Sequence, residues 1–388
     1  MNPIPYGRQE ITQQDINAVV QALTSDFLTQ GPAIAQFEKN FSGYVGSRYA
    51  VAISNGTAAL HLAVMALGLK PGEKVITTPI TFAASANCVL YCGGEVVFAD
   101  IDKDSYLIDL NKVRELLEKD KKIKGIIPVD FAGNPVHMYK LRKLADEFGC
   151  WIIEDACHAP GAYYTDDTGK QHLCGNGQYS DVTVFSFHPV KHIATGEGGM
   201  ITTNNVEVYD KLMMLRTHGI TKDAAKLNEN HGGWYHEMQT LGYNYRITDI
   251  QAALGVSQLT RAEEGMKKRE AIAKRYSEVF KDSAYKIPAA IEKGNRHAFH
   301  LYVIQTEDRL GLYDYLKTKE IYAQVHYLPV HLHPYYQARG FKKGDFPVAE
   351  SYYNKCLSLP MFPSLKKEEH EYVIEHVLQF EKKRKLVL

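Results

Sequence analysis

Short apolar runs alternate with amphipathic segments between residues 50 and 205. The runs with the length and composition of buried strands lie at 51–53, 74–78, 95–99, 125–129, 151–154, 181–185 and 200–203. The segments with apolar positions at helical spacing lie at 56–68, 83–91, 110–119 and 138–148. No clear helix separates the last two strands. Strands joined by helical crossovers predict an α/β fold, with a mostly parallel central sheet and helices on both faces.

The pattern changes in the last third of the chain. Residues 205–285 are predicted to be largely helical. After residue 289, short strands are predicted at 300–305, 323–326 and 357–359, and helices at 310–319 and 368–382. We therefore predict a large domain over residues 1–264 and a smaller C-terminal α+β domain over residues 265–388.

Composition narrows the class of protein. The 388 residues include 45 basic and 45 acidic side chains, and 45% of the chain is apolar. This is a globular composition, and its balanced charge argues against binding nucleic acid or an anionic membrane surface. No apolar run reaches the roughly 18 residues of a membrane span. The six cysteines form no C-x-x-C pair, and the first residues do not resemble a secretion signal, so we expect a cytoplasmic protein with reduced thiols.

Ligands of such sheets bind outside the carboxyl ends of the strands, which draws attention to Asp155 and Lys191. Asp155 closes an apolar strand, where a carboxylate is costly unless a cation or hydrogen-bond donor faces it. Lys191 follows another apolar strand, and a partly desolvated lysine there has a lowered pKa and can form a Schiff base. A structural salt bridge or helix cap for Asp155, and an exposed loop position for Lys191, are the alternatives.

A third candidate is the small-residue turn that opens the helix at residue 56. In Asn55-Gly56-Thr57 the free backbone N–H groups and the helix dipole favour a phosphate or carboxylate. An ordinary N-cap by Asn55 or Thr57 explains the same residues. Together the three candidates match pyridoxal 5′-phosphate: the acid keeps the pyridine nitrogen protonated, the lysine holds the aldehyde as an imine, and the helix start holds the phosphate.

The sequence also resembles the fold-type-I pyridoxal-phosphate enzymes and, within them, the DegT-type sugar aminotransferases. The resemblance covers nearly the whole chain. Its motifs are Leu28-Thr29-Gln30-Gly31-Pro32, Asn55-Gly56-Thr57-Ala58-Ala59-Leu60, Thr78-Pro79-Ile80-Thr81-Phe82, Glu154-Asp155-Ala156 with His158, Ser186-Phe187-His188 with Lys191, Gly196-Glu197-Gly198-Gly199, and Gly242-Tyr243-Asn244-Tyr245-Arg246.

The resemblance implies a role for each matching residue. Lys191, Asp155 and His158 are the implied catalytic residues: Lys191 binds the cofactor, Asp155 pairs with the pyridinium nitrogen, and His158 lies near the phenolic oxygen. The remaining implied cofactor contacts are Gly56, Thr57 and Ser186 at the phosphate, Phe82 on the ring face, and Asn244 at the phosphate of a neighbouring subunit. Asn244 thus implies a homodimer with shared active sites. Some relatives carry Ala or Ser in place of Gly56, which keeps the backbone N–H.

Further motifs are similar to a subgroup that works in pseudaminic acid biosynthesis. They are Pro5-Tyr6-Gly7-Arg8, Asp26-Phe27-Leu28-Thr29, and Gln324-Val325-His326-Tyr327 followed by Pro329-Val330-His331. The implied substrates are L-glutamate, as amino donor, and a UDP-linked 4-keto-6-deoxy sugar. The implied sugar-nucleotide pocket consists of Tyr6, Asp26, Phe27, Leu28, Thr29, Gln324, Val325, His326 and Tyr327.

Other functions stay open at this stage. A different C5 configuration or nucleotide is the nearest alternative, and a pyridoxal-phosphate-fold regulator without turnover is a remote one. Related sugar dehydratases have a histidine in place of the lysine, so Lys191 argues against that activity. His326, His331 and His333 raise the question of a metal, but no nearby carboxylate or cysteine completes a ligand set, and we predict none.

Overall fold

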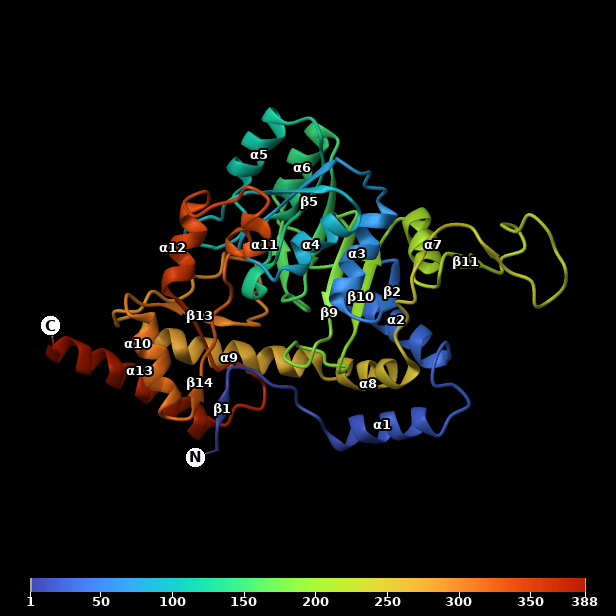
Figure 1. Cartoon of the computed structure of the whole chain (residues 1–388). Helices are drawn as coiled ribbons and strands as arrows, with labels where there is room; N and C mark the ends of the chain where they lie inside the picture. Colours follow the sequence, from blue (N-terminus) through green and yellow to red (C-terminus); the bar gives the residue numbers. More distant parts are fainter. Residues whose placement is uncertain (1, 388) are drawn as a thin grey trace.

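Figure 1 shows the computed structural model, which describes residues 2–387. Seven strands form the central sheet. Their order is β2 (Tyr49–Ile53), β10 (Gly199–Thr203), β9 (Val182–Ser186), β6 (Trp151–Asp155), β5 (Ile123–Ile127), β3 (Lys74–Thr77) and β4 (Glu95–Phe98). The strand β10 runs antiparallel to both of its neighbours, and the other pairs are parallel. The predicted mostly parallel sheet is confirmed.

Helices cover both faces of this sheet (Figure 1). One face packs against α3 (Gly56–Ala66), α4 (Ala84–Tyr91) and α7 (Val206–Leu215). The other packs against α2 (Pro32–Val45), α5 (Leu110–Lys119), α6 (Met138–Phe148) and α8 (Asp249–Leu259). Side chains alternate between the two cores along each strand, as in β2, where Ala52 belongs to one cluster and Ile53 to the other.

The absence of a helix between β9 and β10 has a structural consequence. The two strands are joined by a loop over residues 187–198, and a direct return of this kind gives an antiparallel pair. The loop is fixed at both ends, because Phe187 donates its N–H to the carbonyl of Gly198 and Thr195 donates to the carbonyl of Phe187. This loop carries Lys191.

The C-terminal part forms its own hydrophobic cluster around α9 (Ala262–Phe280), α10 (Arg309–Lys317) and α13 (Lys367–Val387). Here β13 (Tyr302–Gln305) pairs with β15 (Cys356–Leu359), and β1 (Ile4–Pro5) pairs in parallel with β14 (Ile321–Tyr322). The proposed boundary at residue 264 falls inside α9, and the division into two domains stays a prediction. No described helix has the length and apolar character needed to cross a membrane.

The shorter elements complete the chain. They are α1 (Gln13–Leu23), η1 (Phe131–Gly133), β7 (Tyr163–Thr165), β8 (Gln171–Leu173), β11 (Ile220–Thr221), β12 (Glu237–Met238), η2 (Val330–Leu332), α11 (Pro334–Gln337) and α12 (Pro347–Lys355). The strand predicted at 323–326 is wrong: β14 ends at Tyr322, and Gln324 forms only a single bridge to Ser358. The ladder ends at Pro5 and Tyr322, and the carbonyl of the next residue, Tyr6, accepts the N–H of Met361 instead.

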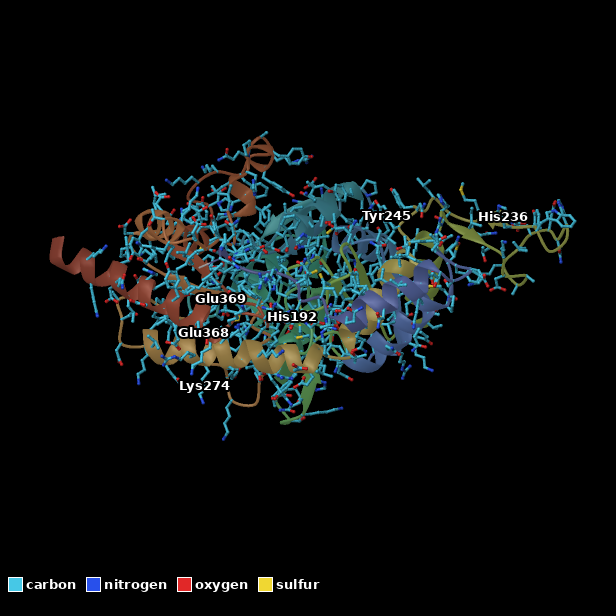
Figure 2. All side chains as sticks on the ribbon, turned by 90° about the horizontal axis from the view of Figure 1, so that it is seen from below. His192, His236, Tyr245, Lys274, Glu368 and Glu369 are labelled. Atoms are coloured by element: carbon cyan, nitrogen blue, oxygen red, sulfur yellow. The ribbon has the colours of Figure 1, made fainter. Side chains whose placement is uncertain are left out.

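The helical prediction for residues 205–285 is wrong between α7 and α8. Residues 216–248 contain no helix, and the part around the β11–β12 pair forms an arm that projects from the body of the molecule (Figure 1). Figure 2 labels His236 on this arm, well away from His192 in the body. The arm is rich in Asn, Gly and His and has no apolar repeat of helical spacing, so no buried stripe stabilises a helix there.

Candidate active site

A cavity of about 730 Å³ opens at the carboxyl ends of β6 and β9 and at the start of α3. It brings together residues that lie far apart in the sequence. The residues predicted for cofactor and substrate that line it are Tyr6, Gly56, Thr57, Phe82, Asp155, His158, Ser186, Lys191, His326 and Tyr327. The lysine, the acid and the helix start thus share one space, as the sequence predicts.

Lys191 lies in the β9–β10 loop between two fully buried residues, Phe187 and Ile193. Phe187 packs against Phe37 and Phe41 of α2, with ring centroids 5.0 and 5.3 Å away. These contacts fix the loop and leave the ε-amine free to face the cavity. Burial lowers the pKa of Lys191 to about 8, although the negative charge of Asp155 opposes this shift.

Asp155 ends β6 with its side chain 4% exposed. Its carboxylate accepts a hydrogen bond from the Ser85 hydroxyl at 2.6 Å and from the backbone N–H of Cys157 at 3.2 Å. Because the Ser85 hydroxyl donates its single proton to Asp155, it accepts a hydrogen bond from the Thr81 hydroxyl, 2.8 Å away. Two donors therefore fix the direction of the Asp155 carboxylate.

His158 is held as a neutral ring with one defined tautomer. Its Nδ1 accepts the backbone N–H of Ala132 at 3.2 Å, so the proton lies on Nε2. That Nε2 lies 3.2 Å from the Tyr327 hydroxyl, which accepts the proton and keeps its own proton for another acceptor. Burial lowers the pKa of His158 well below its ordinary value, and the positive charge of Lys191 adds to the effect.

The start of α3 provides an anion site at the other end of the cavity. Asn55 caps the helix by accepting the N–H of Ala58 at 2.8 Å. Among the described residues, the N–H groups of Gly56 and Thr57 have no acceptor, since the first turn of a helix leaves its donors free. Ser186, at the end of β9, lies directly against Gly56. Two free donors and the helix dipole favour a phosphate group here.

The model of the DegT/DnrJ/EryC1/StrS aminotransferase family matches residues 9–378. The chain belongs to this aminotransferase family. The spore coat polysaccharide biosynthesis protein SpsC of Bacillus subtilis is 40% identical over 96% of each chain. The UDP-4-amino-4,6-dideoxy-N-acetyl-beta-L-altrosamine transaminase of Campylobacter jejuni serotype O:2 is 35% identical over 95% of each chain.

Solved structures are similar over the full length of this aminotransferase. Helicobacter pylori PseC, an aminotransferase of pseudaminic acid biosynthesis, has a TM-score of 0.89 at 30% identity and covers 98% of this chain and 100% of its own. The pyridoxal-phosphate form of the putative sugar aminotransferase Spr1654 from Streptococcus pneumoniae has a TM-score of 0.89 at 29% identity, with both chains fully covered. The chain is thus a pyridoxal-phosphate-dependent sugar aminotransferase.

The side chains of this aminotransferase fit the cofactor. An ionised carboxylate with two donors, a lysine of lowered pKa and a helix start with two free N–H groups all face the same cavity. These are the chemical partners of a pyridinium nitrogen, an aldehyde and a phosphate, respectively. The cavity volume of about 730 Å³ leaves room beyond the cofactor for a substrate.

Gly56→Ala is expected to weaken cofactor binding in this aminotransferase. An added Cβ would lie 2.9 Å from the Cβ of Ser186, so either the helix start or Ser186 must move. Overpacking of this kind costs about 1–3 kcal/mol, which titration of the apoenzyme with pyridoxal phosphate measures as a raised Kd. Gly43→Ala is the control, because its Cβ meets no atom within 4 Å. Equal Kd values for Gly56→Ala and the wild type would contradict the prediction.

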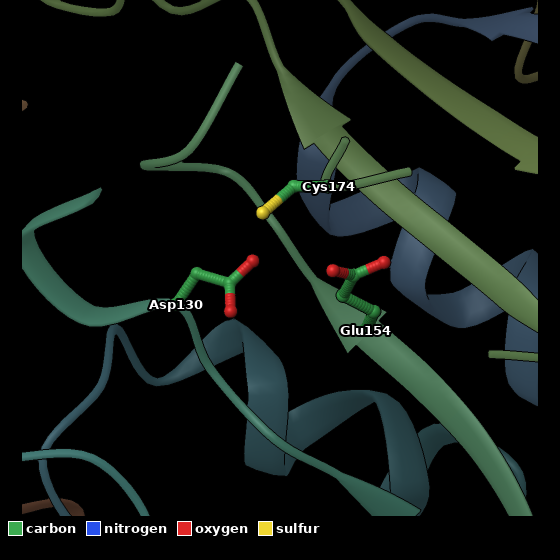
Figure 3. Close-up of side chains that lie close together, drawn as sticks. All are labelled: Asp130, Glu154 and Cys174. Atoms are coloured by element: carbon green, nitrogen blue, oxygen red, sulfur yellow. The ribbon is translucent and has the colours of Figure 1, made fainter. Parts of the chain in front are cut away.

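A buried acidic cluster lies next to the active site. Glu154 precedes Asp155 on β6 and points to the opposite face of the sheet, where it meets Asp130 and Cys174 (Figure 3). The ligand atoms of the three lie within 4.8 Å of one another, and among the residues that the structure describes neither Asp130 Oδ2 nor Glu154 Oε1 has a hydrogen-bond partner. Burial raises the pKa of both carboxyl groups, and two carboxylates this close are not both ionised.

Glu154→Gln is expected to change how stability depends on pH. The folded pKa of Glu154 is raised, so the folded state holds more protons than the unfolded state, and stability falls as pH rises from the ordinary carboxyl pKa to the folded one. The variant lacks this loss, which is about 1.4 kcal/mol for each unit of pKa difference. Its amide also offers a donor to Asp130. Denaturant unfolding between about pH 4 and pH 8 measures the slope.

The exposed Glu118→Gln is the control for that experiment. It should keep the wild-type dependence of unfolding free energy on pH. A Glu154→Gln variant that loses stability with rising pH as steeply as the wild type would show that Glu154 ionises freely in the folded protein.

Several predicted contacts lie outside the cavity of this chain. Asn244 is exposed and pairs through its backbone with Thr217. The segment 26–29 is exposed, and its backbone is held by Asp249, whose N–H donates to the carbonyl of Leu28 and whose carboxylate accepts the N–H of Gly31. Gln324 is exposed and Val325 packs against the core. The binding roles of these residues stay predictions.

The candidate metal ligands are separated into ordinary pairs. His331 Nε2 lies 3.0 Å from the carboxylate of Glu350, and His326 Nδ1 lies 2.8 Å from the Ser358 hydroxyl. In the described part of the chain the three histidines form no common ligand group.

Other cavity residues were not predicted from the sequence. Ser85, which bonds Asp155, lies in the first turn of α4, four residues after Thr81. Two small polar residues four positions apart in an otherwise apolar segment could have indicated a buried hydrogen-bond partner for the site. His300, whose ring centroid lies 4.3 Å from that of His158, comes from the C-terminal part and had no local signal.

Proposed function

We propose that this aminotransferase moves an amino group from L-glutamate to C4 of a UDP-4-keto-6-deoxy-N-acetylhexosamine. The products are UDP-4-amino-4,6-dideoxy-N-acetyl-β-L-altrosamine and 2-oxoglutarate. The observation that carries the proposal is the shared cavity of Lys191, Asp155 and the α3 start. It is supported by one relative named for the proposed amino-sugar product and by one solved relative of pseudaminic acid biosynthesis.

The chemistry divides between the cofactor and the chain. Bound pyridoxal phosphate supplies an aldehyde that bonds to amines and a ring that withdraws electrons. Lys191 would hold the cofactor, and its ε-amine would move the proton at the reacting carbon of the substrate, first as base and then as acid. Asp155 holds the ring nitrogen protonated by its fixed charge. Gly56, Thr57 and Ser186 hold the phosphate.

His158 and Tyr327 orient groups in the middle of the cavity. The neutral His158 ring donates its Nε2 proton to the Tyr327 oxygen, and burial raises the pKa of Tyr327, so its hydroxyl keeps a proton. We assign that proton to an acceptor on the cofactor or sugar. Phe82 is 62% exposed at the cavity and is proposed to cover the ring face.

The sugar nucleotide is proposed to enter along Tyr6, His326 and Tyr327. The rings of Tyr6 and His326 lie 5.1 Å apart and come from opposite ends of the chain. The exposed residues of segment 26–29, with Gln324 and Val325, are the further proposed contacts.

We further propose a homodimer in which Asn244 reaches the phosphate of the partner's site. Asn244 is exposed and lies outside its own cavity. Large apolar side chains are also exposed on α1 and on the arm, among them Val20 at 50%, Leu23 at 52% and Trp234 at 75%. Apolar groups of this size on an open surface are typical of a protein interface.

Subunit mixing tests this assembly. Lys191→Ala and Asn244→Ala are prepared separately, and each is expected to be impaired. In a mixed dimer one site receives the intact lysine from one subunit and the intact asparagine from the other, so activity returns on mixing. If light scattering shows a dimer but mixing restores nothing, Asn244 acts within its own subunit.

A second candidate is another nucleotide-linked 4-keto sugar. The 40% identity to SpsC, a protein of spore coat polysaccharide biosynthesis, favours keeping this alternative. All six cysteines are free thiols, which supports a reducing, cytoplasmic setting for either reaction.

The deciding experiment is product identification. The purified enzyme is incubated with L-glutamate and UDP-4-keto-6-deoxy-N-acetylhexosamines of either C5 configuration, and with dTDP- and GDP-linked 4-keto sugars. We expect amination at C4 of the UDP sugar that leads to the β-L-altro product, established by NMR. Preferred amination of another sugar nucleotide would replace the proposed substrate, and Lys191→Ala serves as the blank.

A further inference from the structure

Arg269 is a buried cation, and no carboxylate among the described residues pairs with it. It lies on α9, is 1% exposed, and is among the largest fully buried side chains. In the described part of the chain, its Nη1 donates to the carbonyl oxygens of Phe299 at 3.1 Å, His300 at 3.3 Å and Met361 at 3.0 Å, and its Nε has no partner. Carbonyl oxygens carry only partial charges, and a buried ion without a counter-ion destabilises the fold. A charged arginine at this position therefore points to a functional role.

The three carbonyls belong to segments that shape the active-site cavity. His300 lines the cavity, and its ring lies 4.3 Å from that of His158. Met361 donates its N–H to the carbonyl of Tyr6 at 2.9 Å, and Tyr6 lines the cavity as well. One guanidinium therefore joins α9 to two separate parts of the cavity wall.

The same guanidinium contributes to the charge environment of Lys191. Its positive charge lowers the pKa of Lys191, while Asp155 and Cys157 at the end of β6 act in the opposite direction. Burial raises the pKa of the Cys157 thiol well above its ordinary value, so that group is neutral. Burial lowers the pKa of Arg269 only to about 10, so the guanidinium stays charged at neutral pH.

The histidines around Lys191 add no charge of their own. They are His158, His192, His300 and His326, and burial is the main cause of a lowered pKa in each. Among the groups that act on Lys191 in the described chain, Asp155 and Arg269 are therefore the two fixed charges at neutral pH.

We propose that Arg269 is a positioning residue for Lys191: its guanidinium holds the His300 and Tyr6 segments of the cavity wall and places a fixed positive charge beside the cavity into which the amine faces. The inference rests on the proposed function, in which Lys191 moves the proton. A nearby cation disfavours the ammonium form, so near neutral pH a larger share of the Lys191 amine is free base than it would be without Arg269. Without Arg269, the negative charge of Asp155 would favour the ammonium form of Lys191.

The test measures the protonation of Lys191 directly. Full-length apoenzyme is labelled with an amine-reactive acylating reagent over a range of pH, and labelling of the Lys191 peptide is followed by mass spectrometry. A family member solved in its apo form shows that such a preparation is reasonable. In Arg269→Gln the midpoint of labelling is expected to move to higher pH, and the rate below the midpoint to fall on the order of tenfold for each pH unit of the shift.

Two further variants separate charge from packing. Arg269→Lys keeps the charge but not the three-way contact, so it should keep the wild-type midpoint while KM for the sugar nucleotide rises. Arg275→Met is the control. Arg275 lies about one and a half turns along α9, on its exposed side, and pairs with Glu371. Its replacement should change neither the labelling midpoint of Lys191 nor KM for the sugar nucleotide. Circular dichroism checks the fold of each variant, and Arg269→Lys still decides if Arg269→Gln does not fold.

The outcomes distinguish this inference from the proposed function. An unchanged midpoint in folded Arg269→Gln, or a displaced midpoint in Arg269→Lys, overturns the role of Arg269 even if Lys191 binds the cofactor. Should Lys191→Ala keep the absorbance of the lysine-bound cofactor, the assignment of Lys191 itself fails, whatever Arg269 does.

Discussion

Replacing Lys191 by alanine is expected to abolish amino transfer and to remove the absorbance of the lysine-bound cofactor. The substitution deletes both the group that holds the cofactor and the base that moves the proton, and such a base contributes about 10²–10⁴-fold on its own. The fold should survive, because Phe187 and Ile193 anchor the loop without help from the ε-amine. Absorbance spectra and steady-state rates with L-glutamate measure both effects.

Lys274→Ala is the matched control for Lys191→Ala. Lys274 lies on α9, is labelled at the surface in Figure 2, and has a side chain that is 79% exposed. It should leave the spectrum and the rate unchanged. A Lys191→Ala enzyme that transaminates at the wild-type rate would remove this residue from the mechanism.

Asp155→Asn is expected to keep part of the bound cofactor but to lose most of the turnover, on the order of 10²–10³-fold. Asparagine has nearly the same shape, and its carbonyl oxygen can still accept from Ser85 or from the N–H of Cys157. It carries no charge, so the ring nitrogen is no longer held protonated. Cofactor Kd and kcat, measured on the same preparation, separate the two effects.

Ser85→Ala provides a graded comparison for Asp155→Asn. It removes the 2.6 Å donor but leaves the carboxylate and its charge in place. We expect a smaller loss of turnover than in Asp155→Asn, because the remaining N–H of Cys157 still orients the group. Near-native turnover in Asp155→Asn would exclude the electrostatic role, however Ser85→Ala behaves.

The elements with a clear apolar pattern could be predicted closely. The bounds of α5 and α6 are those indicated by apolar spacing, because each helix buries one stripe against the sheet. The strand predicted at 125–129 is instead β5 (Ile123–Ile127). Apolar character continues past its end, but Pro128 has no N–H for the ladder, so the regular strand ends at Ile127 and pairing resumes only as a single bridge between Val129 and Asp155.

The candidate site was predictable only in part. Asp155 and Lys191 each follow a strand of a parallel sheet, and that geometry brings strand ends together at one edge. His300 and Arg269 come from the C-terminal part, and their places depend on how α9 packs against the rest of the chain. No local spacing carries that information. The contacts across a dimer are likewise not fixed by the pattern of one chain.

The pairing of β1 with β14 binds the beginning of the chain to its last third. Ile4 is 1% exposed and belongs to the same core as Val373 and Val377 of α13. During synthesis Ile4 is made first and the α13 residues that pack against it are made last. Ile4 therefore stays unburied until nearly the whole chain has left the ribosome. Deleting β1 would therefore leave a hole in the core of the C-terminal part, where Ile4 is buried.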